Sequence, residues 1–320
     1  MNELWAVTGA SGFIGRQLIA VLDESDARIR VLVRGGGGPG AVVGRITDAD
    51  ALRKLVAGSD VVVHLAAYVH RRAGTRNEKQ ECRATNVEGT KLLIDAISSE
   101  APGAFLIFFS SASVYAPSTE ALDEHAAISP KTFYGKTKLE AEQLVLDAVR
   151  TGRLHAAILR PAMVFGVDGP GNLRRLLALL RLRLAPMLGG GRFRKSVIPV
   201  EMIVDAIIGV AAHSMLCNGN IFNVAGATLT MRRIIELLEE GLGISAVHLP
   251  FPRSPVRLAA AVADSVMSAM QIRTSPFVQI VDAYSTPVVL NDEELRRIVS
   301  LGGEREVEVA LRRAAHDSTR

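Results

Sequence analysis

The 320-residue sequence predicts an α/β fold, with a doubly wound parallel sheet and a smaller, interleaved substrate lobe towards the C-terminus. Two observations support this prediction. Short runs that are apolar throughout, such as Leu4-Trp5-Ala6-Val7 and Phe105–Phe109, alternate with segments of helical periodicity. Continuous apolar runs are typical of strands buried on both faces, and their alternation with helices indicates a parallel sheet. After Pro161, loops rich in glycine and proline interrupt the alternation, which indicates the second lobe.

The alternation predicts a series of elements along the chain. Strands are expected at residues 4–7, 28–33, 60–65, 105–109, 156–159, 197–200 and 220–224. Helices are expected at residues 16–22, 49–56, 84–98, 134–150, 173–184, 201–213 and 231–240. No internal repeat is present.

Composition excludes several classes of protein. The chain is 48% hydrophobic and 22% charged, as is ordinary for a globular protein. Its two cysteines, Cys82 and Cys217, make neither a disulfide framework nor a metal site, and are expected as reduced thiols of a cytoplasmic protein. The net charge of +4 comes from scattered residues. This suits an anionic small-molecule ligand better than nucleic acid, which needs a clustered basic face.

The sequence also carries no expected targeting or membrane-spanning segment. The N-terminus runs directly into a strand, so no signal peptide is expected, and no run of ~18 apolar residues is present. One apolar stretch, Val256 to Met270, follows three prolines at positions 250, 252 and 255. It could be a lobe helix or a helix for a partner or a membrane surface. Its length and modest charge favour ordinary packing.

A glycine-rich turn, Gly9-Ala-Ser-Gly12-Phe-Ile-Gly15, lies between the first strand and the first helix. Glycines there let the backbone approach a pyrophosphate, and the helix offers free N–H groups and partial positive charge. The spacing differs from the G-x-G-x-x-G form, but strand, turn and helix are in the right order. The turn therefore predicts a dinucleotide site in a Rossmann-like sheet, with a purely structural turn as the alternative.

Arg34 closes the second strand, about 20 residues past the glycine turn. An acidic residue there would hydrogen-bond the ribose 2′-hydroxyl of NAD, whereas an arginine accommodates the 2′-phosphate of NADP. No Asp or Glu is adjacent to Arg34. The sequence thus favours NADP(H), with NAD(H) possible and Arg16 as a second candidate contact. The alternative is that Arg34 is a solvated strand end.

Tyr134 and Lys138 are four residues apart near the start of a predicted helix, so they share one face. A nearby cation lowers the pKa of a tyrosine from its free value near ~10. Such a phenol can exchange a proton with a substrate hydroxyl or ketone near neutral pH. The same spacing occurs by chance on exposed helices, so the meaning of this pair depends on the other motifs.

Six motifs come in order and at suitable distances. They are Thr8-Gly-Ala-Ser-Gly-Phe-Ile-Gly15, His64-Leu-Ala-Ala67, Asn86-Val-Glu-Gly-Thr90, Ser110-Ser-Ala-Ser-Val-Tyr115, Tyr134-Gly-Lys-Thr-Lys138 and Arg160-Pro161. Together they resemble the extended short-chain dehydrogenase/reductase family, in its branch of nucleotide-sugar epimerases, dehydratases and 4-ketoreductases. The resemblance covers roughly residues 4–240 and implies an NAD(P)-dependent enzyme.

The resemblance implies a catalytic set of Ser111, Tyr134 and Lys138. Tyr134 would be the acid/base, Lys138 its partner and a ligand of the nicotinamide ribose, and Ser111 the hydroxyl that binds the reacting oxygen. Ser110 and Ser113 are the alternatives to Ser111, and Ser113 would be structural or face the substrate.

The resemblance also implies contacts with the cofactor and the substrate. Cofactor contacts would come from Gly9, Ser11, Gly12, Phe13, Ile14, Gly15, Arg34, Arg45, Ile46, Leu65, Ala66, Ala67, Pro161 and Val164. Substrate contacts would come from Val69, His70, Ser111, Ser113, Asn172, Leu173, Arg194 and Lys195. His64 would pack without taking part in catalysis, and Asn86 would be structural.

Four departures from the family pattern limit what the resemblance implies. Arg45 replaces the usual Asp near the adenine, and Asp48 is too distant a substitute to rely on. Lys195 replaces a phosphate-binding Arg, which keeps the charge and loses the planar fork. Pro199 and the pair Glu201-Met202 replace an aromatic or His and the usual Asp-Asn. These changes leave the substrate specificity open.

The expected activity is NADP(H)-dependent reduction of a UDP-linked 4-keto sugar at C4. A UDP-sugar 4-epimerase with tightly bound NAD would use the same residues and stays open. A dehydrogenase of a hydrophobic, steroid-like hydroxy compound is a further alternative, supported by the apolar stretch 256–270. A 4,6-dehydratase is disfavoured because Ala112-Ser113 stand where such enzymes carry Asp-Glu. A non-catalytic dinucleotide sensor is disfavoured by the presence of Ser111, Tyr134 and Lys138.

The resemblance also guides the expected domains and assembly. Residues 1–165 with about 199–226 are expected to form the NAD(P)-binding domain, and residues 166–198 with 227–320 the substrate lobe. A homodimer through the helices at 84–98 and 134–150 is possible. No metal ligand set is predicted.

Overall fold

A computed structural model describes residues 3–25, 27–69, 76–167, 169, 172–270 and 277–318. Two of the predicted substrate contacts cannot be placed in the structure. His70 lies outside the described residues, and the side chain of Asn172 is also not described. Among the described parts of the chain, no helix is both long and apolar enough to span a membrane.

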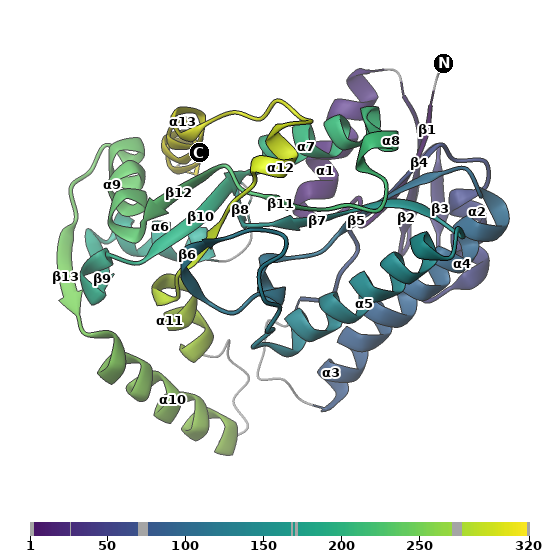
Figure 1. Ribbon diagram of the computed structural model, residues 1–320. Helices are drawn as coiled ribbons and strands as arrows, with labels where there is room; N and C mark the ends of the chain where they lie inside the picture. Colours follow the sequence, from purple (N-terminus) through teal and green to yellow (C-terminus); the bar gives the residue numbers. More distant parts are fainter. Residues whose placement is uncertain are drawn as a thin grey trace.

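The centre of the molecule is a seven-stranded sheet in which every pairing is parallel (Figure 1). Its strand order is β3-β2-β1-β4-β5-β7-β11. The strands are β1 (Leu4–Thr8), β2 (Arg28–Val33), β3 (Ala41–Val43), β4 (Val61–His64), β5 (Phe105–Phe109), β7 (His155–Pro161) and β11 (Ile221–Val224). The order reverses beside β1, where ligands bind in open parallel sheets.

Alternate side chains of each strand face opposite sides of this sheet. On β1, Trp5 and Val7 belong to one core cluster, and Ala6 belongs to the other. The first cluster is covered by α1 (Phe13–Glu24) and α7 (Val200–Ala212). The second is covered by α2 (Ala49–Val56), α4 (Gly89–Glu100) and α5 (Phe133–Arg150). Figure 1 shows these two helical layers on either side of the strands, so the predicted doubly wound α/β fold is confirmed.

Two smaller sheets lie beside the large one. One has five strands: β6 (Ser118–Leu122), β8 (Met163–Phe165), β10 (Arg194–Pro199), β12 (Ala227–Thr230) and β14 (Val288–Leu290). The other pairs β9 (Leu184–Leu188) with β13 (Val247–Phe251). The helices around them are α6 (Asn172–Arg181), α9 (Met231–Leu242), α10 (Arg253–Ala269), α11 (Phe277–Ser285), α12 (Glu293–Arg296) and α13 (Glu304–Asp317).

One core cluster runs from the large sheet into this second part of the chain. It includes Val7 of β1, Phe222 of β11, Leu177 of α6 and Leu237 of α9. The chain returns to the large sheet at β11 after three strands of the smaller sheets, β8, β9 and β10, as an interleaved arrangement requires. The exact domain boundaries given above remain a prediction.

Several predicted element bounds differ from the structure. The helix expected at 84–98 begins earlier, with α3 (Arg76–Arg83), a π-helical turn (Ala84–Glu88) and then α4. The helix expected to reach Leu184 ends at Arg181, because Leu184 pairs with Val247 of β13. The proline-flanked helix begins before Pro255, since a proline in the first turn forfeits no intrahelical hydrogen bond.

Candidate active site

The glycine turn stands at the carboxyl edge of the sheet, between β1 and α1. Gly9 has a φ of +76°, and a β-carbon there would lie 2.6 Å from the backbone nitrogen of Ala66. The amide of Gly12 donates to the carbonyl of Gly9 at 2.9 Å, which closes the turn. Only glycine fits at position 9. At the start of α1, the N-cap residue Gly12 makes no side-chain hydrogen bond to the helix amides, so these amides can face a ligand at the sheet edge. This arrangement fits a pyrophosphate.

A buried chain of hydrogen bonds lies behind this turn. Thr8 Oγ1 is 2.7 Å from Nδ1 of His64, and Nε2 of His64 is 3.0 Å from Oγ1 of Thr90. Thr90 donates its hydroxyl proton to the carbonyl of Asn86, so the His64 Nε2–H must be the donor to Thr90. Burial, helped by the charge of Lys138, lowers the pKa of His64 to about 3. His64 is therefore a neutral structural side chain.

The predicted adenine-end residues lie around the end of β2. Arg34 follows the last residue of β2 and is exposed. Arg16 Nη1 donates to the carbonyl of Ser11 at 3.1 Å, so this arginine supports the glycine turn. Arg45 is exposed and Ile46 is buried. Arg34 and Arg45 are thus accessible to a phosphate of the cofactor.

Asp48, the nearest acidic residue to Arg45 in the sequence, caps the helix α2. Its carboxylate accepts hydrogen bonds from the amides of Asp50 and Ala51, each at 3.1 Å. It is the N-cap of α2, and such caps satisfy helix amides that lack an intrahelical partner. Asp48 therefore does not replace the missing acidic residue near the adenine.

Ser111 and Tyr134 line one cavity, and Lys138 follows Tyr134 by one turn of α5. Thr132 caps α5 by accepting from the amide of Gly135 at 3.0 Å, which starts the helix at Phe133. Tyr134 and Lys138 follow one turn apart. Ser111 follows β5, and its hydroxyl hydrogen-bonds the phenol of Tyr134. The same hydroxyl donates to Ser113 Oγ at 3.1 Å, so the two serines form one polar group beside the phenol.

Burial dominates the acidity of this group. It raises the pKa of the Tyr134 phenol to about 12, although the hydrogen bond from Ser111 acts in the opposite direction. It lowers the pKa of Lys138 to about 7, and the nearby Glu142 carboxylate only partly offsets this. The lowered tyrosine pKa expected from the sequence is therefore wrong for this arrangement. At neutral pH Tyr134 is a protonated acid, which can donate a proton to a carbonyl oxygen.

Lys138 is almost fully enclosed. Its side chain is 2% exposed, and Nζ lies 4.3 Å from the centre of the Phe108 ring. An aromatic face stabilises a cation in such a position. The ammonium is thus held at one place beneath the sheet edge rather than moving on the surface.

Asn86 joins the site to the neighbouring strand. Its Oδ1 accepts from the amide of Tyr68 at 2.7 Å, and its Nδ2 donates to Oγ1 of Thr137 at 3.0 Å. Thr137 in turn donates to the carbonyl of Tyr134 at 2.8 Å. Asn86 lies in the π-helical turn, a feature that often marks functional sites. It fixes the first turn of α5 against the segment after β4.

A cavity of about 1000 Å³ opens in front of the phenol. Of the predicted cofactor and substrate contacts, its wall includes Val69, Ser111, Ser113, Tyr134, Pro161 and Lys195. Arg194 is exposed and is not part of this wall. Leu173 and Val164 are not on the wall either, and pack against the hydrophobic core.

Lys195 is the predicted phosphate contact that the structure does bring to the cavity. Its side chain is 7% exposed, and burial together with the charge of Arg253 lowers its pKa to about 8. A lysine ammonium at this place can pair with an anionic group of a ligand.

The polar residues of the cavity wall that the sequence analysis missed include Arg253, Arg257, Asp282 and Thr286. Asp282 pairs with Arg257 at 2.9 Å and with Arg253 at 3.6 Å. They come from α10 and α11, beyond the last recognised motif. No local pattern marks them, because the fold of the C-terminal lobe brings them to the site. With Lys79, Lys131 and Lys195, the wall carries five basic residues and one acidic residue.

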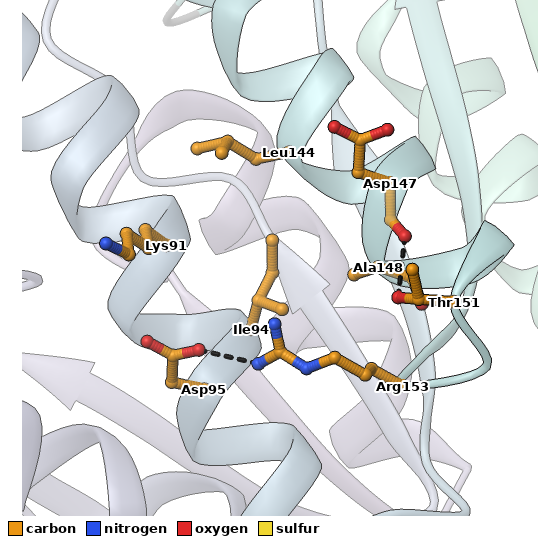
Figure 2. A pocket seen from close by; sticks show the side chains of 8 residues that line it. All are labelled: Lys91, Ile94, Asp95, Leu144, Asp147, Ala148, Thr151 and Arg153. Atoms are coloured by element: carbon orange, nitrogen blue, oxygen red, sulfur yellow. Dashed lines mark hydrogen bonds and ion pairs between the residues drawn. The ribbon is translucent and has the colours of Figure 1, made fainter.

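A smaller cavity of about 290 Å³ lies between α4 and α5, away from the phenol. Figure 2 shows Ile94 and Leu144 pointing into it, with charged side chains around them. Arg153 pairs there with Asp95 at 2.7 Å. These are the helices expected to form a homodimer, and that assembly remains a prediction. No residue predicted for chemistry lies in this cavity.

Comparison with known families decides the identity of the chain. The model of the NAD dependent epimerase/dehydratase family matches residues 5–225. The chain belongs to this family. It is accordingly an NAD(P)-dependent enzyme of the extended short-chain dehydrogenase/reductase type, and a nicotinamide cofactor is shown at the level of the family.

Two curated members of the family illustrate its range. The 4-hydroxy-2-methyl-3-oxo-4-farnesyl-3,4-dihydroquinoline-1-oxide ketoreductase of Stigmatella aurantiaca is 28% identical over 312 residues, covering 93% of this chain and 91% of the relative. The N-acetyl-alpha-D-glucosaminyl-diphospho-ditrans,octacis-undecaprenol 4-epimerase of Escherichia coli is 28% identical over 266 residues, covering 79% and 77%.

Solved structures share the fold of this chain. The UDP-glucuronic acid 4-epimerase of Bacillus cereus, in complex with UDP-glucuronic acid and NAD, has a TM-score of 0.78 at 20% identity, with 99% of each chain covered. RMD of Pseudomonas aeruginosa, complexed with NADPH, has a TM-score of 0.75 at 19% identity, covering 99% of this chain and 100% of that one. Both forms of the cofactor thus occur on this fold.

Proposed function

We propose that this protein is an NADP(H)-dependent oxidoreductase that reduces the 4-keto group of a nucleotide-linked sugar at C4. The observation that carries this proposal is a cavity whose wall holds Ser111, Tyr134 and five basic residues, with Lys138 one helical turn after Tyr134. The nucleotide is proposed to be UDP.

The cofactor site is proposed at the carboxyl edge of the large sheet. The glycine turn would hold the pyrophosphate, because position 9 admits no β-carbon and α1 presents free amides. Arg34 would hold the 2′-phosphate of NADP(H). Lys138 would hold the nicotinamide ribose. When bound, the nicotinamide supplies the hydride that the carbonyl carbon receives.

The protein residues would handle the proton and the developing charge. Ser111 donates a hydrogen bond to the carbonyl oxygen, which stabilises negative charge as it forms there. Tyr134, protonated at neutral pH, gives its proton to the same oxygen and completes the alcohol. In the reverse direction the phenolate takes the proton back. The buried ammonium of Lys138 stabilises that phenolate, because opposite charges favour each other strongly away from water.

The charge of the cavity wall supports a substrate with a diphosphate. Five cations face one carboxylate, and two of the cations are arginines, whose fork suits phosphate oxygens. The volume of about 1000 Å³ is at the upper end of the range for small-molecule sites. A sugar nucleotide is a ligand of that size and charge.

Two other substrates are supported by particular observations. The Escherichia coli relative is a 4-epimerase, and epimerisation with tightly bound NAD would use the same three catalytic residues. The Stigmatella aurantiaca relative, which covers 93% of this chain, is a ketoreductase of a farnesylated compound. Exposed apolar side chains on α10, next to Arg253 and Arg257 of the cavity wall, favour such a hydrophobic group on the substrate.

A substrate panel tests these proposals. UDP-linked 4-keto-6-deoxy-N-acetylhexosamine, UDP-hexoses and a prenylated ketone would each be offered with NADPH, NADH or no added cofactor. The proposed reductase consumes NADPH with the keto sugar. Turnover of UDP-hexoses without added cofactor would instead identify an epimerase, and turnover of the prenylated ketone alone would identify a hydrophobic substrate.

Tyr134→Phe tests the catalytic assignment with whichever substrate the panel identifies. Loss of the acid should lower kcat by about 100-fold or more while cofactor binding persists. Lys136→Met, which alters an exposed lysine on the same helix, is the control. Equal turnover by Tyr134→Phe and the unaltered protein would refute the assignment.

A further inference from the structure

The outer face of α10 and the residue after it carry a row of exposed apolar side chains. Leu258, Val262, Val266 and Met270 stand four residues apart, so they follow one line along the helix. Their exposed fractions are 68%, 56%, 49% and 64%. We call these four residues the α10 stripe. A surface helix of a globular protein normally turns polar residues to solvent, so this face differs from what solvent alone would favour.

The charge pattern of α10 leaves the stripe uninterrupted. Asp264 is the one charged residue between Leu258 and Met270. Its carboxylate accepts from the amides of Phe277 and Val278 at 2.7 and 3.0 Å, so it faces the start of α11. The exposed row therefore presents only apolar side chains.

The opposite face of α10 is already used by the protein. Val256 and Ala260 pack there against Leu188 and Val281. In Figure 1, α10 lies at the lower edge of the molecule with α11 on its inner side. The helix is thus apolar on both faces. The packing of its inner face is enough to hold α10 on the protein, so the apolar outer face is not needed for that packing.

The cavity wall at the start of α10 is rich in basic residues. Arg253 and Arg257, in the first two turns of α10, line the cavity and share Asp282 as a partner. Lys79 and Lys131 of the same wall are exposed. One helix thus carries an exposed apolar row along its length and basic residues at its start, a combination that matches a surface with anionic headgroups above an apolar layer.

A second copy of the chain fits the stripe less well. From Leu258 to Met270 the helix is about 18 Å long, and with a width of about 10 Å its outer face covers on the order of 200 Å². A stable protein interface needs about 800 Å² from each partner. A lipid surface has no such minimum, because each apolar side chain that enters it contributes separately.

We propose that the α10 stripe inserts into the surface of an anionic lipid bilayer and so holds the protein against that bilayer. The docking itself is independent of the chemistry. That docking places a working reductase at the bilayer rests on the proposed function, which assigns the chemistry to Tyr134 and Ser111.

Flotation of the full chain with vesicles tests the docking. Vesicles of phosphatidylcholine with one quarter phosphatidylglycerol would be compared with vesicles of phosphatidylcholine alone. The unaltered protein should float with the anionic vesicles and markedly less with the neutral ones. Val262→Glu should reduce the bound fraction at least about ten-fold, because a carboxylate enters the apolar layer and repels the headgroups.

The matched control is Met215→Glu, which places the same charge at an apolar residue of α8 (Ser214–Cys217) that is 93% exposed. This variant should float as the unaltered protein does. Leu258→Ser, which adds no charge, should weaken flotation less than Val262→Glu. Circular dichroism and binding of the nicotinamide cofactor would establish that each variant is folded.

Three results would overturn the docking proposal. They are failure of the unaltered protein to float, equal flotation of Val262→Glu, and a concentration-dependent dimer in light scattering that Val262→Glu dissociates. The Tyr134→Phe variant separates the two proposals. If it floats normally while turnover is lost, both hold. If flotation fails while the keto sugar is still turned over, only the docking is wrong.

Discussion

Gly135 and Ser113 approach each other so closely that a β-carbon at position 135 would lie 2.3 Å from the Ser113 carbonyl oxygen. Atoms at that distance overlap strongly, so only glycine lets α5 start there. The contact holds the first turn of α5 against the segment that carries Ser111. It therefore sets the position of the Tyr134 phenol relative to the serine hydroxyl, which is the relationship that the proposed proton transfer needs.

Gly135→Ala should lower activity more than it lowers stability. The added methyl group pushes the first turn of α5 away from Ser111, and a misplaced catalytic group of this kind costs about 100-fold in turnover. Overpacking should reduce the free energy of unfolding by about 1–3 kcal/mol. Turnover and urea unfolding would measure both effects. Gly103→Ala, where a β-carbon meets nothing within 4 Å, should leave both unchanged. Unchanged turnover in Gly135→Ala would show that the contact does not position the site.

Lys138 should make the stability of the protein depend on pH above neutrality. Its pKa is lowered from 10.5 to about 7 by burial. Between these values the unfolded chain holds a proton that the folded protein does not, so the free energy of unfolding rises as pH increases. The rise from this group is at most about 1.4 kcal/mol per pH unit.

Lys138→Met should remove that part of the pH dependence. Urea unfolding of both proteins at about pH 6.5 and about pH 9 would measure it as the difference between the two slopes. The comparison cancels other titrating groups, because both proteins contain them. Slopes of the same size would mean that Lys138 keeps an ordinary pKa in the folded protein.

Arg34→Glu should change the cofactor preference. A glutamate repels the 2′-phosphate of NADPH and can accept a hydrogen bond from the ribose 2′-hydroxyl of NADH. The KM for NADPH should rise at least about ten-fold, and the KM for NADH should fall. Steady-state kinetics with both cofactors would show this. Arg28→Glu, at the other end of β2, is the control. Tighter use of NADH by the unaltered protein would contradict the proposed preference.

Glu142 and Arg160 form a buried ion pair whose loss should be costly. Their side chains are 1% and 3% exposed, and the guanidinium contacts both carboxylate oxygens, at 2.9 and 2.7 Å. Glu142→Gln leaves the Arg160 charge buried without a counter-ion, which should cost about 3–5 kcal/mol of unfolding free energy. Asp95→Asn breaks the half-exposed pair with Arg153 and should cost about 1 kcal/mol or less. Equal costs in thermal unfolding would contradict this difference.

The large sheet could be predicted from local sequence because its signals are local. The strand at Arg28–Val33 and the helix at Ala49–Val56 have the expected bounds. A buried parallel strand needs a continuous apolar run, and a covering helix needs its own periodicity, whatever the partner. The first residue of β9, Leu184, was expected to end a helix. It becomes a strand residue only through its pairing with Val247 of β13, 63 residues further along the chain.

The candidate site divides in the same way. The sequence alone identifies the glycine turn and the spacing of Tyr134 and Lys138, because motifs of this kind are short and act through neighbouring backbone and one helical turn. The acidity of Tyr134, the absence of Arg194 from the cavity wall, and the presence of Arg253 and Arg257 on that wall depend on burial and on packing of distant segments. Those properties exist only in the folded chain, because the solvent exposure of a residue and its long-range neighbours are not encoded in the local sequence around it.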